Sequence, residues 1–211
     1  TNEVQVFEYQ LNIKGKQLTF EGRTAPLESY QPNNPSQRHV VWMARDISTR
    51  KAAEEEVQRL AFFDPLTNLP NRRMLNDRLS MYVEQIKQSD HTGALLFLDL
   101  DNFKRINDSL GHNAGDEILV ELSQRLTRVL NPTDTLARVG GDEFIILIEN
   151  VGDSHKQASL ESELMAKMVQ SVFYDKFEIG DLAFQVSCSI GICLINNANA
   201  ISENILKFAD T

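Results

Sequence analysis

The chain has 211 residues, of which 42% are hydrophobic and 24% are charged, as is typical of a soluble globular protein rather than a disordered one. Its formal net charge of -9 argues against nucleic acid binding, which depends on many Lys and Arg contacts with phosphate. No apolar run approaches the roughly 20 residues that cross a bilayer, and no signal peptide opens the chain. We expect no nucleic acid partner, no membrane contact within this span and a cytoplasmic location, although the parent protein could be membrane-anchored outside it.

Residues 1–47 have the patterning of strands. Apolar and polar residues alternate over 4–13 and 18–25, with Gly15 at the turn, and a third run over 40–47 follows a loop rich in Pro, Asn and Ser. This pattern predicts an antiparallel meander of about three strands. A meander of that size is too small to be an independent domain with a ligand cavity.

Residues 48–63 are predicted to form a helix with Ser48 as its N-cap. Ala53, Val57 and Leu60 are spaced four and three residues apart, as in the seam of a coiled coil. Two turns of this pattern fit an amphipathic connector that packs on its own domain as well as a parallel dimer helix. Both alternatives stay open.

From residue 64 onward, helical and strand patterns alternate, with a hairpin over 135–148. The other predicted elements are helices over 71–88, 103–110, 116–130, 159–173 and 201–210, and strands over 94–99 and 184–195. Such interleaving predicts an α+β fold with a mixed sheet covered by helices. Cys188 and Cys193 lie five residues apart on one predicted strand and face opposite sides, so we expect two buried free thiols in a reducing compartment.

The hairpin is the most informative part of the chain. Gly140 and Gly141 stand between two apolar runs and are followed directly by Asp142 and Glu143. Glycine accepts positive φ at no steric cost and lets a ligand approach the bare backbone, so the pair predicts a tight turn with two carboxylates at its tip. That arrangement suits the approach of a divalent cation and a polyphosphate.

A second acidic pair, Asp99 and Asp101, ends the apolar strand over 94–99. Ligand sites in open α/β sheets lie at strand ends, so we expect Asp99 and Asp142 to converge on one cation. Carboxylates without a neighbouring His or Cys favour Mg²⁺ or Mn²⁺ over zinc. We interpret Asp101 instead as a cap of the following helix. The residues after Asp101 do not fit an EF-hand, and the chain has no Walker A sequence.

Three segments resemble a known family: 99–108 (Asp-Leu-Asp-Asn-Phe-Lys-Arg-Ile-Asn-Asp), 111–116 (Gly-His-Asn-Ala-Gly-Asp) and 140–144 (Gly-Gly-Asp-Glu-Phe). With the opening turn over 64–73, they are similar to the GGDEF family of diguanylate cyclases. Residues 1–47 resemble the C-terminal part of a PAS sensor domain, whose last strand often ends in Asp-Ile-Thr before a charged helix. The expected organisation is a PAS remnant over 1–47, a linker helix over 48–63 and a GGDEF domain over 64–211.

The resemblance implies a palm-like, nucleotidyl-cyclase-type fold and the condensation of two GTP molecules into cyclic di-GMP and two pyrophosphates. It implies a homodimer, because each domain holds one GTP. It assigns the metal, Mg²⁺ or Mn²⁺, to Asp99, the Leu100 carbonyl and Asp142. Asp99, Asp142 and Glu143 are the implied catalytic residues.

The resemblance also implies the contacts with substrate. Guanine would be recognised by Asn107 and Asp116, whose donor and acceptor groups match the edge of guanine and not that of adenine. Phosphate would lie at the start of the 103–110 helix, with Phe103 and Lys104, and beside Gly141. Family members carry a further Lys and Arg along the last helix, and this chain stops before those positions, so we expect a domain that lacks its C-terminal end.

Two other functions stay open. The chain could be a non-catalytic GTP-binding domain that regulates an attached cyclic di-GMP phosphodiesterase domain after residue 211, or chiefly a dimerisation module. The intact run over 140–144 favours catalysis. Many cyclases of the family also carry an Arg-x-x-Asp motif that binds product and inhibits the enzyme. The matching residues here are Asn131-Pro132-Thr133-Asp134, which lack the arginine, so we expect no tight product binding there.

Overall fold

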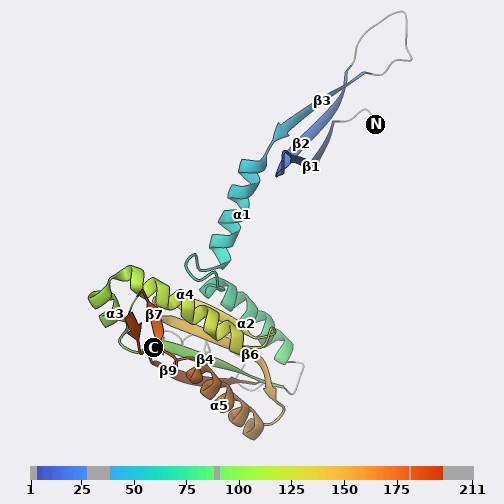
Figure 1. The fold of residues 1–211 in the computed structure, drawn as a ribbon. Coiled ribbons are helices and arrows are strands. Elements are labelled where there is room, and N and C mark those ends of the chain that lie inside the picture. The colour runs from blue at the N-terminus through green and yellow to red at the C-terminus, as the bar shows by residue number, and fades with distance from the viewer. Residues whose placement is uncertain (1–3, 28–38, 88–90, 181, 197–211) are drawn as a thin grey trace, which may run out of the picture. The chain divides into compact units, whose positions relative to one another are not determined.

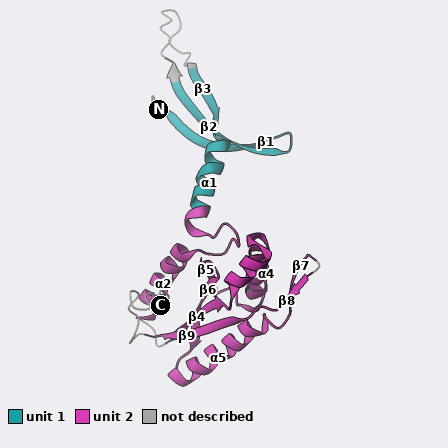
Figure 2. Cartoon of the chain, turned by 90° about the vertical axis from the view of Figure 1, so that its left-hand side faces the viewer, with its two compact units in different colours: residues 1–59 teal, residues 60–211 magenta. Residues whose placement is uncertain are grey.

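The computed structural model describes residues 4–27, 39–87, 91–180 and 182–196 (Figure 1). The chain separates into two compact units, Thr1–Arg59 and Leu60–Thr211 (Figure 2). The helix predicted over 201–210 lies outside the described residues. Across the described ranges, no helix combines the length and the apolar character needed to cross a membrane.

The first unit contains an antiparallel sheet in the order β1-β2-β3. Lys14 and Gly15 form the two-residue turn between β1 and β2, and their positive φ angles of 54° and 81° suit the twist of a tight hairpin. The three strands agree with the meander predicted from the sequence. Their bounds are Gln5–Ile13 for β1, Lys16–Leu27 for β2 and His39–Asp46 for β3.

One face of this sheet carries aromatic rings. Tyr9 stacks on Phe20 with ring centroids 5.8 Å apart, and Trp42 lies 6.3 Å from Tyr9. Gly22 lies opposite Phe7, and a Cβ at Gly22 would come within 2.7 Å of the Phe7 ring. Any residue larger than glycine at this position would therefore require the exposed Phe7 ring to shift.

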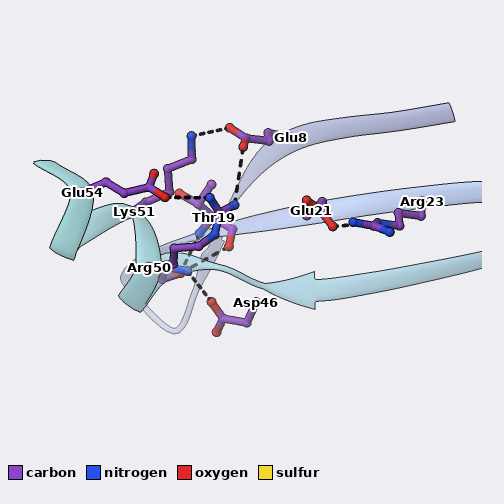
Figure 3. A network of polar contacts seen from close by, with 9 residues as sticks. Glu8, Thr19, Glu21, Arg23, Asp46, Arg50, Lys51 and Glu54 are labelled. Carbon is purple, nitrogen blue, oxygen red and sulfur yellow. Dashed lines mark hydrogen bonds and ion pairs between the residues drawn. The ribbon is translucent and has the colours of Figure 1, made fainter.

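Helix α1 (Ser48–Phe62) is tied at its start to the strands before it. Ser48 is the first helical residue and not the predicted N-cap, because its hydroxyl lies against β2 and accepts a hydrogen bond from the Thr19 N–H at 2.8 Å. The Asp46 carboxylate accepts from the Ser48 N–H at 2.9 Å instead, and hydrogen bonding from Ser48 lowers the pKa of Asp46. Lys51 Nζ lies 2.8 Å from Glu8 Oε2 (Figure 3).

The second unit is built on a sheet in the order β5-β6-β4-β9. All of its pairings are antiparallel, so within the described residues the sheet is antiparallel rather than mixed. Because β4 and β5 both run antiparallel to β6, which lies between them, they run in one direction without pairing. The α+β class is confirmed. The strands are β4 (Thr92–Leu100), β5 (Thr135–Gly140), β6 (Glu143–Gly152) and β9 (Cys188–Ile195), with a separate hairpin of β7 (Phe177–Ile179) and β8 (Leu182–Phe184).

The helices of this unit begin and end within about one turn of their predicted bounds. Two of them have side-chain caps: Asn71 Oδ1 accepts from the Met74 N–H at 3.1 Å, and Ser154 Oγ accepts from the Gln157 N–H at 3.3 Å. The helices are α2 (Arg72–Ile86), α3 (Phe103–Leu110), α4 (His112–Val129) and α5 (His155–Ser171).

The alternation of side chains along β4 divides the core into two layers. Leu96 and Leu98 face one side, where they pack with residues of α4 and α5, and Leu95 faces the other side, where it packs with α2. Cys188 lies in the first layer and Cys193 in the second, so the two thiols face opposite sides, as the sequence predicted. Both are free and half-buried, and burial raises the pKa of Cys188 to about 12.

The strand predicted over 184–195 is interrupted. β8 ends at Phe184 and β9 begins at Cys188. Gln185 Nε2 donates a hydrogen bond to the Phe173 carbonyl at 2.5 Å, and Val186 is buried. These contacts hold the intervening residues against the end of α5, so they cannot continue a straight strand.

The chain between α5 and β7 is held by one side chain of α4. The Arg125 guanidinium donates hydrogen bonds to the carbonyls of Val172, Asp175 and Lys176. It also lies 4.0 Å from the ring centroid of Phe177. This arginine therefore fixes a connection that forms no helix or strand of its own.

Candidate active site at the hairpin tip

The site lies where the end of β4 meets the start of β6. Asp99, near the end of β4, is the direct cross-strand partner of Glu143, the first residue of β6. Gly141 and Asp142 form the turn that joins β5 to β6. The antiparallel pairing therefore brings together carboxylates that are more than 40 residues apart in the sequence.

Of the two purposes that the sequence suggested for the glycines of this hairpin, positive φ angles and room for a ligand, the structure contradicts the first. Neither Gly140 nor Gly141 has a positive φ angle. A Cβ at Gly140 would lie 3.2 Å from Glu143 Oε2, whereas the space around Gly141 is open. The pair thus leaves room for the Glu143 carboxylate and for a ligand, and the expected left-handed backbone is absent from both positions.

The negative charges of the site act on Asp99. Burial, and then the carboxylates of Asp142 and Asp101, raise its pKa. Glu143 has a cation nearby, because Arg72 Nη2 lies 3.9 Å from its Oε2. A bound cation would relieve the crowding of Asp99 and Asp142.

The described residues contain no group of three or more His, Cys, Asp or Glu side chains placed to hold a metal ion. The expected donor set is different, since it consists of two carboxylates, Asp99 and Asp142, and the backbone carbonyl of Leu100. Oxygen donors of this kind suit Mg²⁺ or Mn²⁺. The donor chemistry and the crowded acids therefore fit a hard divalent cation.

Asp101 does not cap the following helix, so that interpretation was wrong. Its carboxylate accepts hydrogen bonds from Ser187 Oγ at 2.6 Å and from Ser189 Oγ at 2.8 Å, and these bonds lower its pKa. Asn102, with φ of 58°, occupies the cap position without a side-chain bond to the helix. The two serines were missed from the sequence, where their only sign is the alternation Ser-Cys-Ser at the start of the last strand.

A second cluster lies where α3 meets α4. Asn107 Oδ1 is buried and has no hydrogen-bond partner among the residues that the structure describes, and a Cβ at Gly115 would lie 1.9 Å from it. Gly115 therefore leaves the room into which this amide projects. Asp116 is exposed on α4, and since that helix begins at His112, Asp116 is not its cap.

Of the residues expected to contact phosphate, Phe103 is buried at the start of α3 and Lys104 is exposed beside it. Gly141 is exposed at the hairpin tip. Lys104 forms no ion pair with any other residue of the described ranges. The start of α3 follows β4 by two residues, so it adjoins the Asp99 end of the sheet.

Arg138 was also missed from the sequence. Its Nε and Nη2 donate to the Gly141 carbonyl at 3.0 and 2.7 Å, and its Nη1 donates to Asp64 Oδ1 at 2.9 Å. Beside it lies a pocket of about 350 Å³, which Arg72, Arg73 and the backbone of 139–141 also line. The carbonyl of the hairpin turn is therefore fixed by a charged side chain.

Comparison with known proteins agrees with this geometry. A family model described as "Diguanylate cyclase, GGDEF domain" matches residues 61–211. The chain is 40% identical over 158 residues to the bifunctional diguanylate cyclase/cyclic di-GMP phosphodiesterase MucR of Pseudomonas aeruginosa, a match that covers 75% of this chain and 22% of MucR. It is 36% identical over 173 residues to the cyclic di-GMP phosphodiesterase PdeR of Escherichia coli, covering 82% of this chain and 25% of PdeR.

These matches mean that the chain spans a quarter or less of the length of MucR and PdeR. Among solved structures, the GGDEF domain of TpbB (YfiN) from Pseudomonas aeruginosa superposes with a TM-score of 0.64 at 33% identity, covering 70% of this chain and 84% of that one. The family match includes the carboxylates of the hairpin, the end of β4 and the junction of α3 with α4. The chain belongs to the GGDEF domain family.

Proposed function

We propose that the chain contains the catalytic domain of a diguanylate cyclase, which condenses two GTP molecules into cyclic di-GMP and two pyrophosphates. The observation that carries this proposal is the meeting of Asp99 and Asp142 at the tip of an intact Gly-Gly-Asp-Glu-Phe hairpin. MucR, which is named as a bifunctional diguanylate cyclase and phosphodiesterase, supports it by its 40% identity. In each of the two steps, a ribose 3′-hydroxyl attacks the α-phosphate of the other GTP and pyrophosphate leaves.

In this proposal, Asp99, Asp142 and the Leu100 carbonyl would hold Mg²⁺ or Mn²⁺. The chemistry that such a cation would supply is polarisation of the α-phosphate, a lower pKa of the attacking hydroxyl and neutralisation of the leaving pyrophosphate. Glu143, across the strands from Asp99, is the second acidic residue of the hairpin in the same site. The protein contributes mainly position and charge, because phosphoryl transfer needs little covalent help from side chains.

The triphosphate would lie between the start of α3 and the hairpin. The first turn of a helix has free N–H groups and a positive dipole end, which attract phosphate, and Phe103 and Lys104 occupy this turn of α3. Gly141 has no side chain, and nothing lies within 4 Å of where its Cβ would be. A phosphate group can therefore come close to the backbone of the turn.

Guanine would be read by Asn107 and Asp116. The unpartnered Oδ1 of Asn107 supports this assignment, since an unsatisfied buried polar atom costs about 1–3 kcal/mol and a donor on the base would satisfy it. Asp116 would accept from the N–H groups of the guanine edge. Adenine would set an acceptor against this carboxylate and would be rejected.

Catalysis would require two copies of the domain, because one site holds one GTP and the product joins two. Val57 and Leu60 on α1 are 67% and 48% exposed, which suits a helix that pairs with a second copy. We further propose that residues 1–47 are the C-terminal part of a PAS domain and that 48–63 are the linker helix between it and the GGDEF domain.

The test is to incubate the chain with GTP and Mg²⁺ and to separate the products by chromatography. We expect cyclic di-GMP together with two pyrophosphates per molecule formed, and no cyclic dinucleotide when ATP replaces GTP. A chain that binds GTP and releases neither product would disprove catalysis.

The second candidate function is a non-catalytic GTP-binding domain that regulates an attached phosphodiesterase. Its support is that PdeR, at 36% identity, is named as a cyclic di-GMP phosphodiesterase and is far longer than this chain. GTP binding without turnover, measured by calorimetry beside the product assay, would favour this function over the first.

A further inference from the structure

Asp101 lies one residue beyond the end of β4 and forms hydrogen bonds with residues at the start of β9. Each of its carboxylate oxygens accepts one serine hydroxyl, Oδ2 from Ser187 at 2.6 Å and Oδ1 from Ser189 at 2.8 Å. Its backbone N–H donates to the Ser187 carbonyl at 3.0 Å. Three hydrogen bonds thus join Asp101 to Ser187, directly before β9, and to Ser189 in β9, and we call this set the serine clamp.

The backbone bond of the clamp sets the direction of the Leu100 carbonyl. In a trans peptide, the C=O of one residue and the N–H of the next point in opposite directions. The Asp101 N–H points toward β9, so the Leu100 C=O points away from β9, toward the side on which β6 lies. The pairing of β4 with β6 ends at Asp99 and Glu143, so this carbonyl is directed toward the turn that contains Asp142.

The clamp acts where the chain would otherwise be free to turn. The next residue, Asn102, has φ of 58°, and α3 begins directly after it. The peptide that carries the Leu100 carbonyl therefore lies between a regular strand and a sharp change of direction. A fixed Asp101 keeps that peptide in the orientation of the strand.

We propose that Asp101, Ser187 and Ser189 are positioning residues that aim the Leu100 carbonyl and the neighbouring Asp99 at the divalent cation of the hairpin site. This inference rests on the proposed function, because that function supplies the cation. The clamp residues touch neither the cation nor the substrate. Their role is to hold a donor set in place before the ion arrives, as hydrogen-bonded partners of ligands do in metal sites.

The alternative is that Asp101 is itself a ligand, and the two roles predict opposite results when the serines are removed. In the double variant Ser187→Ala/Ser189→Ala, the Asp101 carboxylate keeps its charge and loses its hydroxyl partners. A ligand freed in this way would bind the cation as well as before or better. If Asp101 instead positions the donor set, the double variant would bind the cation more weakly.

The probe is Mn²⁺ alone, added to the chain without nucleotide and followed by the electron paramagnetic resonance signal of the free ion. We expect the double serine variant to bind Mn²⁺ roughly tenfold more weakly than the wild type. Asp101→Asn should retain most of the affinity, because an amide can still bond both hydroxyls, while Asp101→Ala should lose as much as the double serine variant. Ser171→Ala, which removes a hydroxyl bonded to the Met168 carbonyl on α5, is the matched control and should leave affinity unchanged.

The single variants Ser187→Ala and Ser189→Ala give the same information if the double variant does not fold, with a smaller loss of affinity expected for each. Unchanged Mn²⁺ affinity in the serine variants would overturn the clamp, as would a wild-type chain that binds no Mn²⁺. A wild-type chain that binds Mn²⁺, loses it in the serine variants and forms no cyclic di-GMP would overturn the proposed function alone.

Discussion

Arg138 Nη1 lies 2.9 Å from Asp64 Oδ1, which joins residues 74 positions apart in the sequence. The same guanidinium holds the carbonyl of Gly141, while Asp64 also accepts from the N–H and the hydroxyl of Thr67. Both side chains are largely buried, at 13% and 18% exposure. The turn that opens the second unit is thereby connected to the hairpin that bears the acidic residues.

Asp64→Ala should lower the free energy of unfolding by about 2–3 kcal/mol, because it leaves Arg138 without its carboxylate and removes the bonds that close the Thr67 turn. Urea denaturation followed by circular dichroism measures the change. Glu84→Ala, which breaks an ion pair with Lys87 on the surface of α2, is the control and should cost less than about 0.5 kcal/mol. Equal losses in the two variants would contradict the importance of the pair.

The same pair predicts a dependence on pH. Burial would raise the pKa of Asp64, but hydrogen bonds from Thr67 and Arg138 outweigh it and hold the pKa below its usual 3.8. The stabilisation is therefore complete above the unfolded pKa and is lost as the pH falls through the lower folded pKa. The stability difference between the wild type and Asp64→Ala should be constant from about pH 7 to pH 5 and should shrink below about pH 4. A difference that widens in acid would contradict this sign.

Asp142→Ala should abolish formation of cyclic di-GMP and leave the fold as stable as before or slightly more stable. The reason is that Asp142 raises the pKa of Asp99 by like-charge repulsion, which the substitution removes. Product chromatography and urea denaturation on the same preparation separate the two effects. Wild-type turnover in this variant would eliminate Asp142 as a metal ligand.

Asp116→Asn should weaken GTP binding, because the amide presents a donor group where the carboxylate accepted from the guanine edge. We expect roughly a tenfold loss of GTP affinity by calorimetry, with ATP still poorly bound. Glu117→Gln, the neighbouring exposed acid on α4, controls for the change in charge. If GTP affinity is the same in the Asp116 variant and the wild type, the guanine role is wrong.

Cyclic di-GMP should bind weakly, if at all, at the turn that contains Asp134. Asn131 replaces the arginine of the family motif, and the Asp134 carboxylate accepts from the Asn131 N–H at 2.9 Å, so it already has a partner. Titration of cyclic di-GMP into the wild-type chain by calorimetry measures this. Submicromolar binding that disappears in Asp134→Ala would contradict the prediction.

The elements that the sequence predicted correctly are those whose patterns depend on residues close together in the sequence. The helix over 103–110 has the predicted bounds, and the three strands of the first unit follow their alternation. The meeting of Asp99 with the hairpin was also expected, because strand ends in such sheets gather at ligand sites.

What could not be predicted depends on partners far along the chain. Asp101 was interpreted as a helix cap because its serine partners lie 86 and 88 residues away and only strand pairing brings them close. The break before β9 has the same origin, since Gln185 bonds to a carbonyl at the end of α5. Such contacts leave no sign in the local sequence pattern. For this reason the sequence predicted a helix cap at Asp101 and an unbroken strand over 184–195.

The hydrogen bonds from Arg125 to the chain after α5 show how the conformation of a segment can be set by a side chain from another helix. The carbonyls of Val172, Asp175 and Lys176 all accept from this one side chain of α4, so part of the path of residues 172–176 is set by a residue outside them. Val172 and Phe173 are buried in the core, whereas the exposed positions 174–176 could therefore vary as long as the arginine remains. A lysine there would keep the charge but lacks the planar group that reaches several carbonyls at once. One position on another helix thus gives the exposed part of this connection its freedom to vary.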